Sequence, residues 1–416
     1  MSHRQRKAYS SALHGFRTGV NCMENGEYFA LDEKSAAEYA CAKGFFCSQG
    51  ANVRCKEIGD GNMNYIYRIS DGEKSVILKQ AGLSTRLSSE RSISRKRNRR
   101  EAAALEAENE ILPGCAPKVY LYDETMDCMF MEDLKDYTVL RKALIEEDRI
   151  FPDFAEQISS FLAETWVRTS DVGKDHIQKK YQVKRFTNPE LCEISERLVF
   201  DEAMFNLSGK NSVEPENELF VKTNIYQNET LHQEAGKLKY RYMTEAQALL
   251  HGDLHTGSIF VNELGMKIFD SEFAFYGPMG YDIGNLIAHL LLARENARQN
   301  QKPAGVIWAE NTVSKIPELF VVKGMDHEQV QKDAFEKILN KWYYMGILED
   351  TAGYAGLELI RRVVGSAKAE DIVSLGQGKR AEAERRILEM GIDLVLNRNK
   401  FREPGAFKNM FVRSGS

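Results

Sequence analysis

The chain has 416 residues and a mass of 47.4 kDa, 43% of its residues are hydrophobic, and 56 basic against 61 acidic residues leave a formal net charge of −5. This length exceeds that of a usual single domain and predicts two packed lobes, while the apolar content excludes a disordered chain. The slight acidic excess argues against a nucleic-acid-binding protein, which usually carries a cationic surplus.

Membrane insertion and export are not expected either. No apolar run approaches the ~20 residues that cross a bilayer, and the basic N-terminus lacks the apolar middle segment of a secretory signal. The seven cysteines are scattered without a CxxC pair, which predicts free thiols in a reducing compartment. We therefore expect a cytoplasmic globular protein.

The first third of the chain predicts an extension, one helix and an antiparallel meander. Residues 1–26 are polar, basic and without period, and we interpret them as a loosely ordered extension. A helix is expected in LDEKSAAEYACAKGFF, capped by Asp32 or Ser35 and ended by Gly44. Short segments rich in β-branched and aromatic residues predict strands: VRCKEIG, NYIYRIS, SVILKQ, VYLYDE and DCMFMED. A basic stretch at 95–100, interpreted as a solvated loop and helix start, leads into the helical segment EAAALEAENEIL.

After residue 133 the strand signals fade and helical periods dominate. Apolar residues recur with helical spacing in several segments: FAEQISSFLAETWV, AQALL, GNLIAHLLLA, AFEKILNKWYYMGIL, GLELIRRVVGSAKAEDIV and KRAEAERRILEMGIDLVL. We therefore predict an α+β fold of two lobes. Residues 27–133 form an antiparallel-sheet N-lobe, and residues 134–416 form a mainly helical C-lobe.

The strongest chemical signal is HGDLHTGSIF at 251–260, followed by KIFDSEF at 267–273. Asp253 and Asp270 flank an expected hairpin, which returns the chain to its starting end, so both carboxylates can face one pocket. Phosphoryl transfer needs one carboxylate to orient or deprotonate the attacking hydroxyl and a second to hold Mg²⁺ on the ATP phosphates. The pattern resembles the protein-kinase-like superfamily, in its branch of aminoglycoside and choline phosphotransferases.

This motif departs from the superfamily pattern at two places. Ser258 stands where the superfamily usually has an Asn that binds a second metal ion. We count Ser258 among the cofactor contacts, although a hydroxyl is a weaker Mg²⁺ ligand. Downstream the chain has Asp270-Ser271-Glu272 instead of Asp-Phe-Gly, and Glu272 offers an additional anionic oxygen. We hypothesise that Asp270 and Glu272 share the metal ion.

The N-lobe supplies candidates for holding the ATP phosphates. Gly59 and Gly61 lie in a turn between two strands, where backbone amides can approach phosphate oxygens, although many ordinary hairpins look similar. Lys79 ends a strand about where a kinase-like lobe places its phosphate-pairing lysine. Its acidic partner is expected to be Glu101, with Glu106 and Glu108 as rivals on the same helix.

Three further polar residues are interpreted as structural. Asp282 begins a helix after a Gly-Pro turn, and an acid at this place in kinase-like folds commonly bonds the backbone of the catalytic loop. His251 and His255 are expected to pack within that loop, because the adjacent Asp253 suits the role of base better.

Collinear segments over roughly residues 28–375 resemble the 5-methylthioribose kinase family: GDGNMNY, MEDL, FTNPELCEISERLVF, HGDLHTGSIF, DSEFAFYGP and ELIRRVVGSAKAEDI. The resemblance implies a homodimeric kinase that uses ATP and Mg²⁺ to phosphorylate the 1-hydroxyl of a small sugar, S-methyl-5-thioribose, in methionine salvage. It implies ATP contacts from Asn64, Lys79, Glu132, Asp133 and Leu134, metal ligation by Asp270 and Glu272, and sugar contacts from Asp253, Arg361 and Arg362.

One segment departs from that family. Between Lys79 and Glu101 the family usually carries a closing loop of the Gly-Glu-Ser-Trp-Pro-Leu type, whereas this chain has LSTRLSSERSISRKRNRR. A different lid leaves two alternatives open: a phosphotransferase for another small hydroxyl acceptor, and a nucleotide-binding pseudokinase that acts as a scaffold. The pair Arg361 and Arg362 favours a neutral or anionic acceptor, and the retained acidic and basic motif residues argue against the scaffold.

Overall fold

The computed structural model describes residues 27–47, 52–58, 64–82, 84–85, 88–92, 94–327 and 334–413. They divide into two compact units, one holding the chain up to Ala102 together with Lys118–Asp133, the other holding Ala103–Pro117 and the chain from Leu134 onward. The lobe boundary expected after residue 133 coincides with a unit boundary, but residues 103–117 group with the second unit instead of the N-lobe. The expected extension at 1–26 lies outside the described residues.

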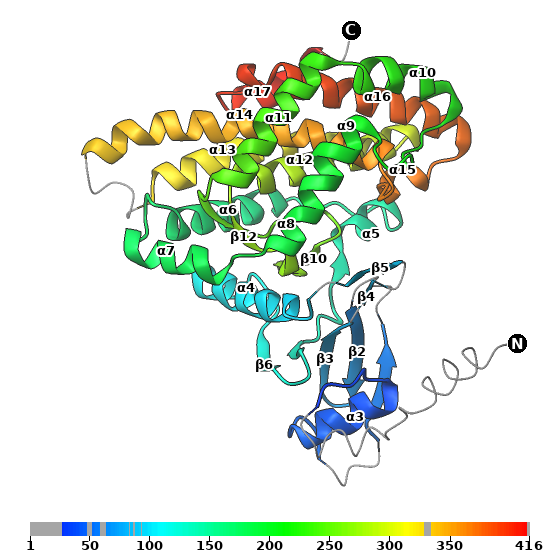
Figure 1. Cartoon of the computed structure of the whole chain (residues 1–416), viewed down its shortest axis with the longest axis vertical. Coiled ribbons are helices and arrows are strands. Elements are labelled where there is room, and N and C mark those ends of the chain that lie inside the picture. The colour runs from blue at the N-terminus through cyan, green and yellow to red at the C-terminus, as the bar shows by residue number, and fades with distance from the viewer. Residues whose placement is uncertain are drawn as a thin grey trace, which may run out of the picture. The chain divides into compact units, whose positions relative to one another are not determined.

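The first unit is built on the antiparallel meander that the sequence predicts (Figure 1). Its sheet has the order β1-β2-β3-β7-β6, and every neighbouring pair is antiparallel. The bounds are β1 Arg54–Glu57, β2 Asn64–Ser70, β3 Ser75–Ala81, β6 Val119–Asp123 and β7 Cys128–Glu132, and a small hairpin adds β4 Ser84–Thr85 and β5 Ser88–Ser92. Helix α3 (Glu33–Ala42) buries Ala36, Tyr39 and Ala40 in one core cluster with strand residues such as Leu78 and Phe130.

Asp32, not Ser35, is the N-cap of α3. The Asp32 carboxylate accepts from the Ser35 backbone N–H at 2.7 Å, and the Ser35 hydroxyl accepts from the Asp32 N–H at 2.8 Å. This reciprocal capping box satisfies two backbone donors that the first helical turn would otherwise leave unpaired.

Helix α4 (Arg97–Ile111) begins four residues before the predicted segment. Its first residues belong to the core of the first unit, since Arg97 and Asn98 are 1% and 0% exposed. The interpretation of the basic stretch as solvated is therefore wrong for Arg97. Arg95 is also engaged, with its guanidinium 3.7 Å from the ring centre of Tyr28 and 3.3 Å from Asp127.

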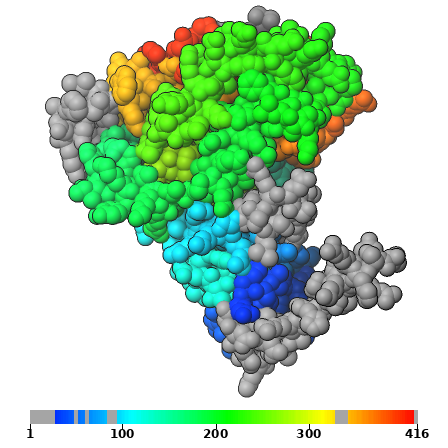
Figure 2. Space-filling view, viewed as in Figure 1, coloured from blue at the N-terminus to red at the C-terminus, as the bar shows by residue number. Residues whose placement is uncertain are grey.

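The second unit is mainly helical, as predicted. Its longer helices are α6 (Phe154–Thr169), α7 (His176–Arg185), α11 (Glu229–Thr244), α12 (Gly280–Gln299), α13 (Pro303–Met325), α14 (Ala334–Val364), α16 (Gln377–Leu396) and α17 (Gly405–Arg413). Helix α12 is buried along almost its whole length and packs against α13, α14 and α16. The shorter α8 (Pro189–Ser195) and α9 (Ala203–Phe205) lie with α11 on the face whose atoms are green in Figure 2.

Two helical predictions in this unit are wrong in detail. AQALL contains strand β9 (Ala248–Leu250), which pairs antiparallel with β12 (Phe275–Gly277). A short, fully buried apolar run carries no period that separates strand from helix. The segment expected as one helix at 356–373 is broken at Gly365, where α14 has ended and α15 (Glu370–Val373) has not begun.

The predicted hairpin between Asp253 and Asp270 is confirmed. Strand β10 (Ile259–Asn262) pairs antiparallel with β11 (Gly265–Ile268), and β8 (Thr138–Val139) adds to its other edge. Among the described residues, no helix is both long and apolar enough to cross a bilayer. The described cysteines are free thiols: Cys41, Cys47, Cys55, Cys115, Cys128 and Cys192.

Candidate active site

The first unit contains a buried ion pair that joins its sheet to α4. Lys79 lies on β3 and its Nζ is 2.7 Å from the Glu101 carboxylate, with 4% and 1% of the two side chains exposed. Of the three candidate partners, Glu101 is therefore the one that pairs with Lys79. The Asn98 amide donates to the Lys79 carbonyl oxygen at 3.2 Å, which fixes the first turn of α4 to the strand that carries the lysine.

Asn64 and Arg97 form a second polar contact at the start of α4. Asn64 begins β2 and is 5% exposed, and its side-chain oxygen accepts from Arg97 Nη2 at 3.0 Å. The predicted phosphate-side glycines Gly59 and Gly61 lie outside the described residues. Neither Arg97 nor Asn98 was identified from the sequence, because a run of five cations in six residues is typical of a solvated segment.

The two acids predicted to contact ATP at 132 and 133 bind neighbouring residues of the first unit. Asp133 receives two parallel hydrogen bonds from Arg68, at 2.9 and 3.0 Å. Glu132 accepts from the Lys118 backbone N–H at 3.1 Å. Leu134, the first residue of the second unit after this strand, is 7% exposed. Any contribution of this segment to adenine recognition would come from its backbone groups.

In the second unit, Asp282 holds the loop that carries Asp253. The Asp282 carboxylate accepts from the backbone N–H groups of His251 at 2.7 Å and Gly252 at 3.0 Å, which confirms its predicted structural role. Burial raises the pKa of Asp282 to about 6, although these two hydrogen bonds favour the ionised form. Gly252 has φ +83°, and a Cβ there would lie 2.3 Å from the Phe273 carbonyl oxygen, so only glycine fits.

Asp253 lies among three cationic or donor side chains. His255 Nε2 is 3.4 Å from Oδ2, while Arg362 Nη2 and Arg361 Nη2 are 3.6 and 4.0 Å from Oδ1. Burial opposes ionisation, but the pKa of Asp253 is nevertheless lowered far below its usual value by His255, Arg362 and Arg361. The side chain keeps 32% of its surface exposed. Asp253 is thus an ionised carboxylate that solvent and ligands can reach.

Arg361 and Arg362 lie in the last turn of α14 and share one anion. Arg361 donates to both Glu358 oxygens at 2.7 Å, and Arg362 Nε donates to Glu358 Oε1 at 2.6 Å. Glu358 is 1% exposed. Both arginines therefore bridge the Glu358 carboxylate and the neighbourhood of Asp253, although consecutive helical residues diverge by about 100°.

The predicted metal motif is joined to the Asp253 loop through the backbone. The Phe269 carbonyl oxygen accepts from His251 Nε2 at 2.9 Å, and the Phe269 N–H donates to the Ser258 carbonyl at 3.1 Å. Asp270 follows with φ +69°, an uncommon left-handed conformation for a non-glycine residue. Carboxylate oxygens of Asp270 and Glu272 lie within 4.8 Å of each other, a donor set of the hard-oxygen type that Mg²⁺ prefers.

Two buried residues hold this motif in place, and the sequence assigned neither of them to it. The Ser271 hydroxyl donates to Glu108 Oε1 at 3.0 Å, and Asn188 Nδ2 donates to the Glu272 carbonyl at 2.9 Å. Glu108 is thus a support of the metal motif, and burial raises its pKa to about 7. The sequence offered one indication of this support, because Asn188 lies in FTNPELCEISERLVF, a segment that resembles the family.

Ser258 closes the loop with its side chain. Its Oγ accepts from the His255 N–H at 2.9 Å and lies 3.1 Å from the Asp253 carbonyl oxygen. The residue is 3% exposed. A hydroxyl that makes these backbone contacts shapes the loop, and the cofactor contact of Ser258 stays a prediction.

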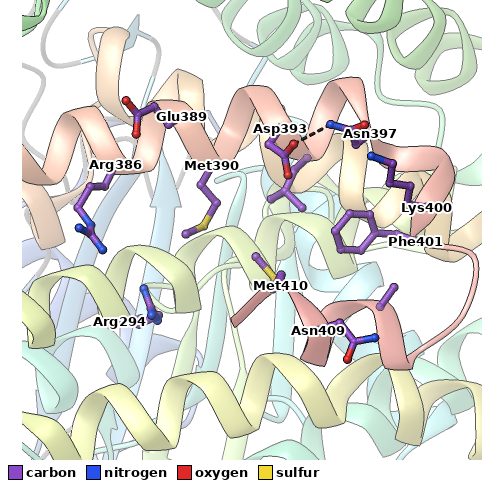
Figure 3. A pocket seen from close by; sticks show the side chains of 12 residues that line it. Arg294, Arg386, Glu389, Met390, Asp393, Asn397, Lys400, Phe401, Asn409 and Met410 are labelled. Atoms are coloured by element: carbon purple, nitrogen blue, oxygen red, sulfur yellow. Dashed lines mark hydrogen bonds between the residues drawn. The ribbon is translucent and has the colours of Figure 1, made fainter. Parts of the chain in front are cut away.

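A separate cavity of about 470 Å³ lies between α12, α16 and α17. Figure 3 shows Arg386 and Met390 extending from α16 toward Arg294 of α12, with Met410 of α17 beside them. None of the described residues that we predicted for the active site lines this cavity. It contributes nothing to the arrangement around Asp253.

Comparison with known proteins shows the family of this chain. A family model described as the phosphotransferase enzyme family matches residues 54–305. A methylthioribose kinase of Bacillus cereus (strain 03BB102) is 36% identical over 395 residues, covering 94% of this chain and 98% of that protein, and a methylthioribose kinase of Bacillus thuringiensis (strain Al Hakam) matches with the same values. Among solved structures, a choline kinase from Cryptosporidium parvum is similar with a TM-score of 0.49 at 12% identity, covering 88% of this chain and 99% of that one. The chain belongs to the methylthioribose kinase family of phosphotransferases.

Proposed function

We propose that this protein transfers the γ-phosphoryl group of ATP to the 1-hydroxyl of S-methyl-5-thioribose, giving S-methyl-5-thioribose 1-phosphate and ADP. The observation that carries the proposal is the environment of Asp253, an ionised, reachable carboxylate within 4.0 Å of two guanidinium groups. A sugar ring offers hydroxyls that such an acceptor and such donors can bind together. Family membership supports this choice of sugar.

Asp253 would act first by orienting the attacking hydroxyl. A carboxylate with a lowered pKa is a weak base, so the hydroxyl donates a hydrogen bond to it in the ground state. The proton passes to Asp253 only as the bond from O1 to the γ-phosphorus forms and the bond to the β–γ bridging oxygen breaks. Holding the nucleophile in line accounts for much of the rate enhancement in phosphoryl transfer.

Charge neutralisation would come from three places. Arg361 and Arg362 would bind sugar hydroxyls and stabilise charge on the transferring group, and Lys79, held by Glu101, would pair with ATP phosphates. Asp270 and Glu272 would hold Mg²⁺, which when bound neutralises the phosphate oxygens. Asn64 and the backbone of Glu132, Asp133 and Leu134 would complete the nucleotide contacts.

The cellular setting is proposed on the family resemblance alone. We infer a homodimeric, cytoplasmic enzyme that acts in methionine salvage. A mass measurement in solution tests the dimer, and a mass equal to one 47.4 kDa chain would overturn that part.

The reaction is tested by an ATP-consumption screen over several acceptors: methylthioribose, ribose, choline, ethanolamine and an aminoglycoside. We expect acceptor-stimulated turnover with methylthioribose and little with cationic acceptors, because two guanidinium groups next to Asp253 repel them. Higher turnover with another acceptor would replace the sugar assignment, and stimulation by none would favour a nucleotide-binding scaffold.

A further inference from the structure

Around Asp253 the second unit contains a closed ring of buried and partly buried polar side chains, and the proposed reaction assigns a role to only some of them. Its members come from α5 (Leu140–Ile145), the loop after β9, α12 and the end of α14. We call it the Asp253 ring: Arg141, His255, Asp253, Arg361, Arg362, Glu358 and His289.

Arg141 contacts both histidines of the ring through one nitrogen. Its Nη2 lies 3.2 Å from His289 Nδ1 and 3.4 Å from His255 Nδ1. A guanidinium group only donates, so both Nδ1 atoms must accept and neither carries a proton. Arg141 is itself held 3.5 Å from Asp371, a carboxylate with 0% of its side chain exposed.

A backbone contact gives the same tautomer for His255 independently. The Gly257 N–H donates to His255 Nδ1 at 2.9 Å, and a backbone amide cannot accept. A Cβ at position 257 would lie 2.7 Å from the imidazole ring and 3.0 Å from the Arg141 guanidinium carbon. Glycine at this place is what allows His255 and Arg141 to approach the loop backbone closely.

With Nδ1 accepting, the proton of each histidine lies on Nε2, and each Nε2 faces a carboxylate. His255 Nε2 is 3.4 Å from Asp253 Oδ2, and His289 Nε2 is 3.2 Å from Glu358 Oε1. Burial lowers the pKa of both histidines, and the nearby cations Arg141 and Arg362 lower it further. Both rings are therefore neutral donors.

The ring leaves one oxygen of Asp253 available. Oδ2 lies 3.4 Å from His255 Nε2, at the outer limit of hydrogen-bond distance, whereas Oδ1 is 3.6 and 4.0 Å from the two guanidinium groups, beyond that limit. Both guanidinium groups donate hydrogen bonds to Glu358, and His289 contacts the same carboxylate. The direction of the available lone pair on Oδ1 thus depends on both histidines.

We propose that His255 and His289, as neutral Nε2–H donors set by Arg141, are positioning residues: His255 fixes the rotation of the Asp253 carboxylate, and His289 fixes Glu358 and through it the arginine pair. The proposal rests on the proposed function, because it assigns the reacting oxygen of that same site. The sugar hydroxyl would donate its hydrogen bond to Asp253 Oδ1.

Two matched substitutions of His255 separate donation from packing. A glutamine places its amide near Nε2 and can still donate to Asp253, whereas an asparagine reaches only the Nδ1 position and cannot. We expect His255→Asn to lower kcat for methylthioribose about 10- to 100-fold, with KM for ATP changed less than about twofold, because the nucleophile loses its orientation. His255→Gln should recover kcat to within about threefold of wild type.

The exposed His176 provides the control, and His176→Gln should match wild type in kcat, KM and melting temperature. Equal kcat for His255→Asn and wild type would overturn the proposal. So would equal losses in His255→Asn and His255→Gln, since that result would assign His255 to packing only. The corresponding pair at 289 should act mainly on KM for the sugar, with His289→Asn worse than His289→Gln.

A measurement without turnover tests the ring even if the sugar assignment fails. In wild-type protein labelled with ¹⁵N-histidine, His255 and His289 should each show one unprotonated and one protonated ring nitrogen at neutral pH, with Nε2 protonated. The two glutamine variants assign the signals. An imidazolium signal or an Nδ1–H tautomer for either residue would overturn the ring, whereas a wild-type enzyme inactive on methylthioribose would overturn only the function.

Discussion

The two units solve the problem of fixing a charged side chain in different ways. In the first, Lys79 pairs with the buried carboxylate of Glu101, between a strand and a helix. In the second, Asp253 lies in a ring of residues from four separate elements. A buried ion pair loses its charge compensation when one partner is removed, whereas a ring loses orientation in steps, so the two regions should respond differently to single substitutions.

The largest effect is expected at Asp253, the carboxylate that we place next to the attacking hydroxyl. Asp253→Asn should lower kcat about 10³- to 10⁴-fold with ATP binding retained, because the hydroxyl loses its acceptor and base. Steady-state kinetics and nucleotide-binding calorimetry measure the two quantities. Asp148→Asn, at an acid with 58% of its side chain exposed, is the control and should behave as wild type. Turnover within tenfold of wild type for Asp253→Asn would contradict the assignment.

The ion pair of Lys79 with Glu101 is tested by removing one partner and then both. Lys79→Met should lower the free energy of unfolding by about 3–5 kcal/mol, since the buried Glu101 carboxylate loses the ammonium group 2.7 Å away. The double variant Lys79→Met with Glu101→Leu should regain most of that stability but not the turnover. Denaturant unfolding of both variants makes the comparison. A single variant as stable as wild type would show that the pair contributes little.

The metal motif is expected to respond more mildly. Glu272→Gln should raise the Mg²⁺ concentration for half-maximal turnover about 10- to 100-fold, because one anionic oxygen beside Asp270 is lost. A magnesium titration at saturating substrates measures the shift, and Glu263→Gln, at a side chain 85% exposed, is the control. An unchanged Mg²⁺ requirement would remove Glu272 from the metal site.

The smallest effect concerns Glu108, which supports that motif through Ser271. Burial raises its pKa from 4.5 to about 7 in the folded protein, so the folded state holds a proton that the unfolded chain releases. The contribution of Glu108 to the free energy of unfolding is fully present below about pH 4.5. It is lost as the pH rises through 7, and the total loss is about 3 kcal/mol.

Glu108→Gln should therefore flatten the decline of melting temperature between pH 5 and about 8. Glu106→Gln, on the exposed side of the same helix, should leave that decline unchanged. A decline of equal slope in wild type and Glu108→Gln would contradict the raised pKa.

The same comparison explains how far sequence reasoning could go. The meander, the hairpin at 259–268 and the pair of Lys79 with Glu101 follow from local patterns and from one strand–helix contact, and the structure bears them out. The ring could not be predicted, since Arg141, His289 and Glu358 are far apart in the chain and each resembles an ordinary helix residue. Burial of Arg97 and the strand in AQALL were missed for a related reason, because short segments take their environment from distant neighbours.

The most direct test of the account is to observe the product of wild-type enzyme with ATP, Mg²⁺ and methylthioribose by ³¹P NMR. We expect a new sugar-phosphate resonance coupled to the anomeric proton, growing in step with ADP and absent with Asp253→Asn. A phosphate on another hydroxyl, or release of inorganic phosphate alone, would contradict it.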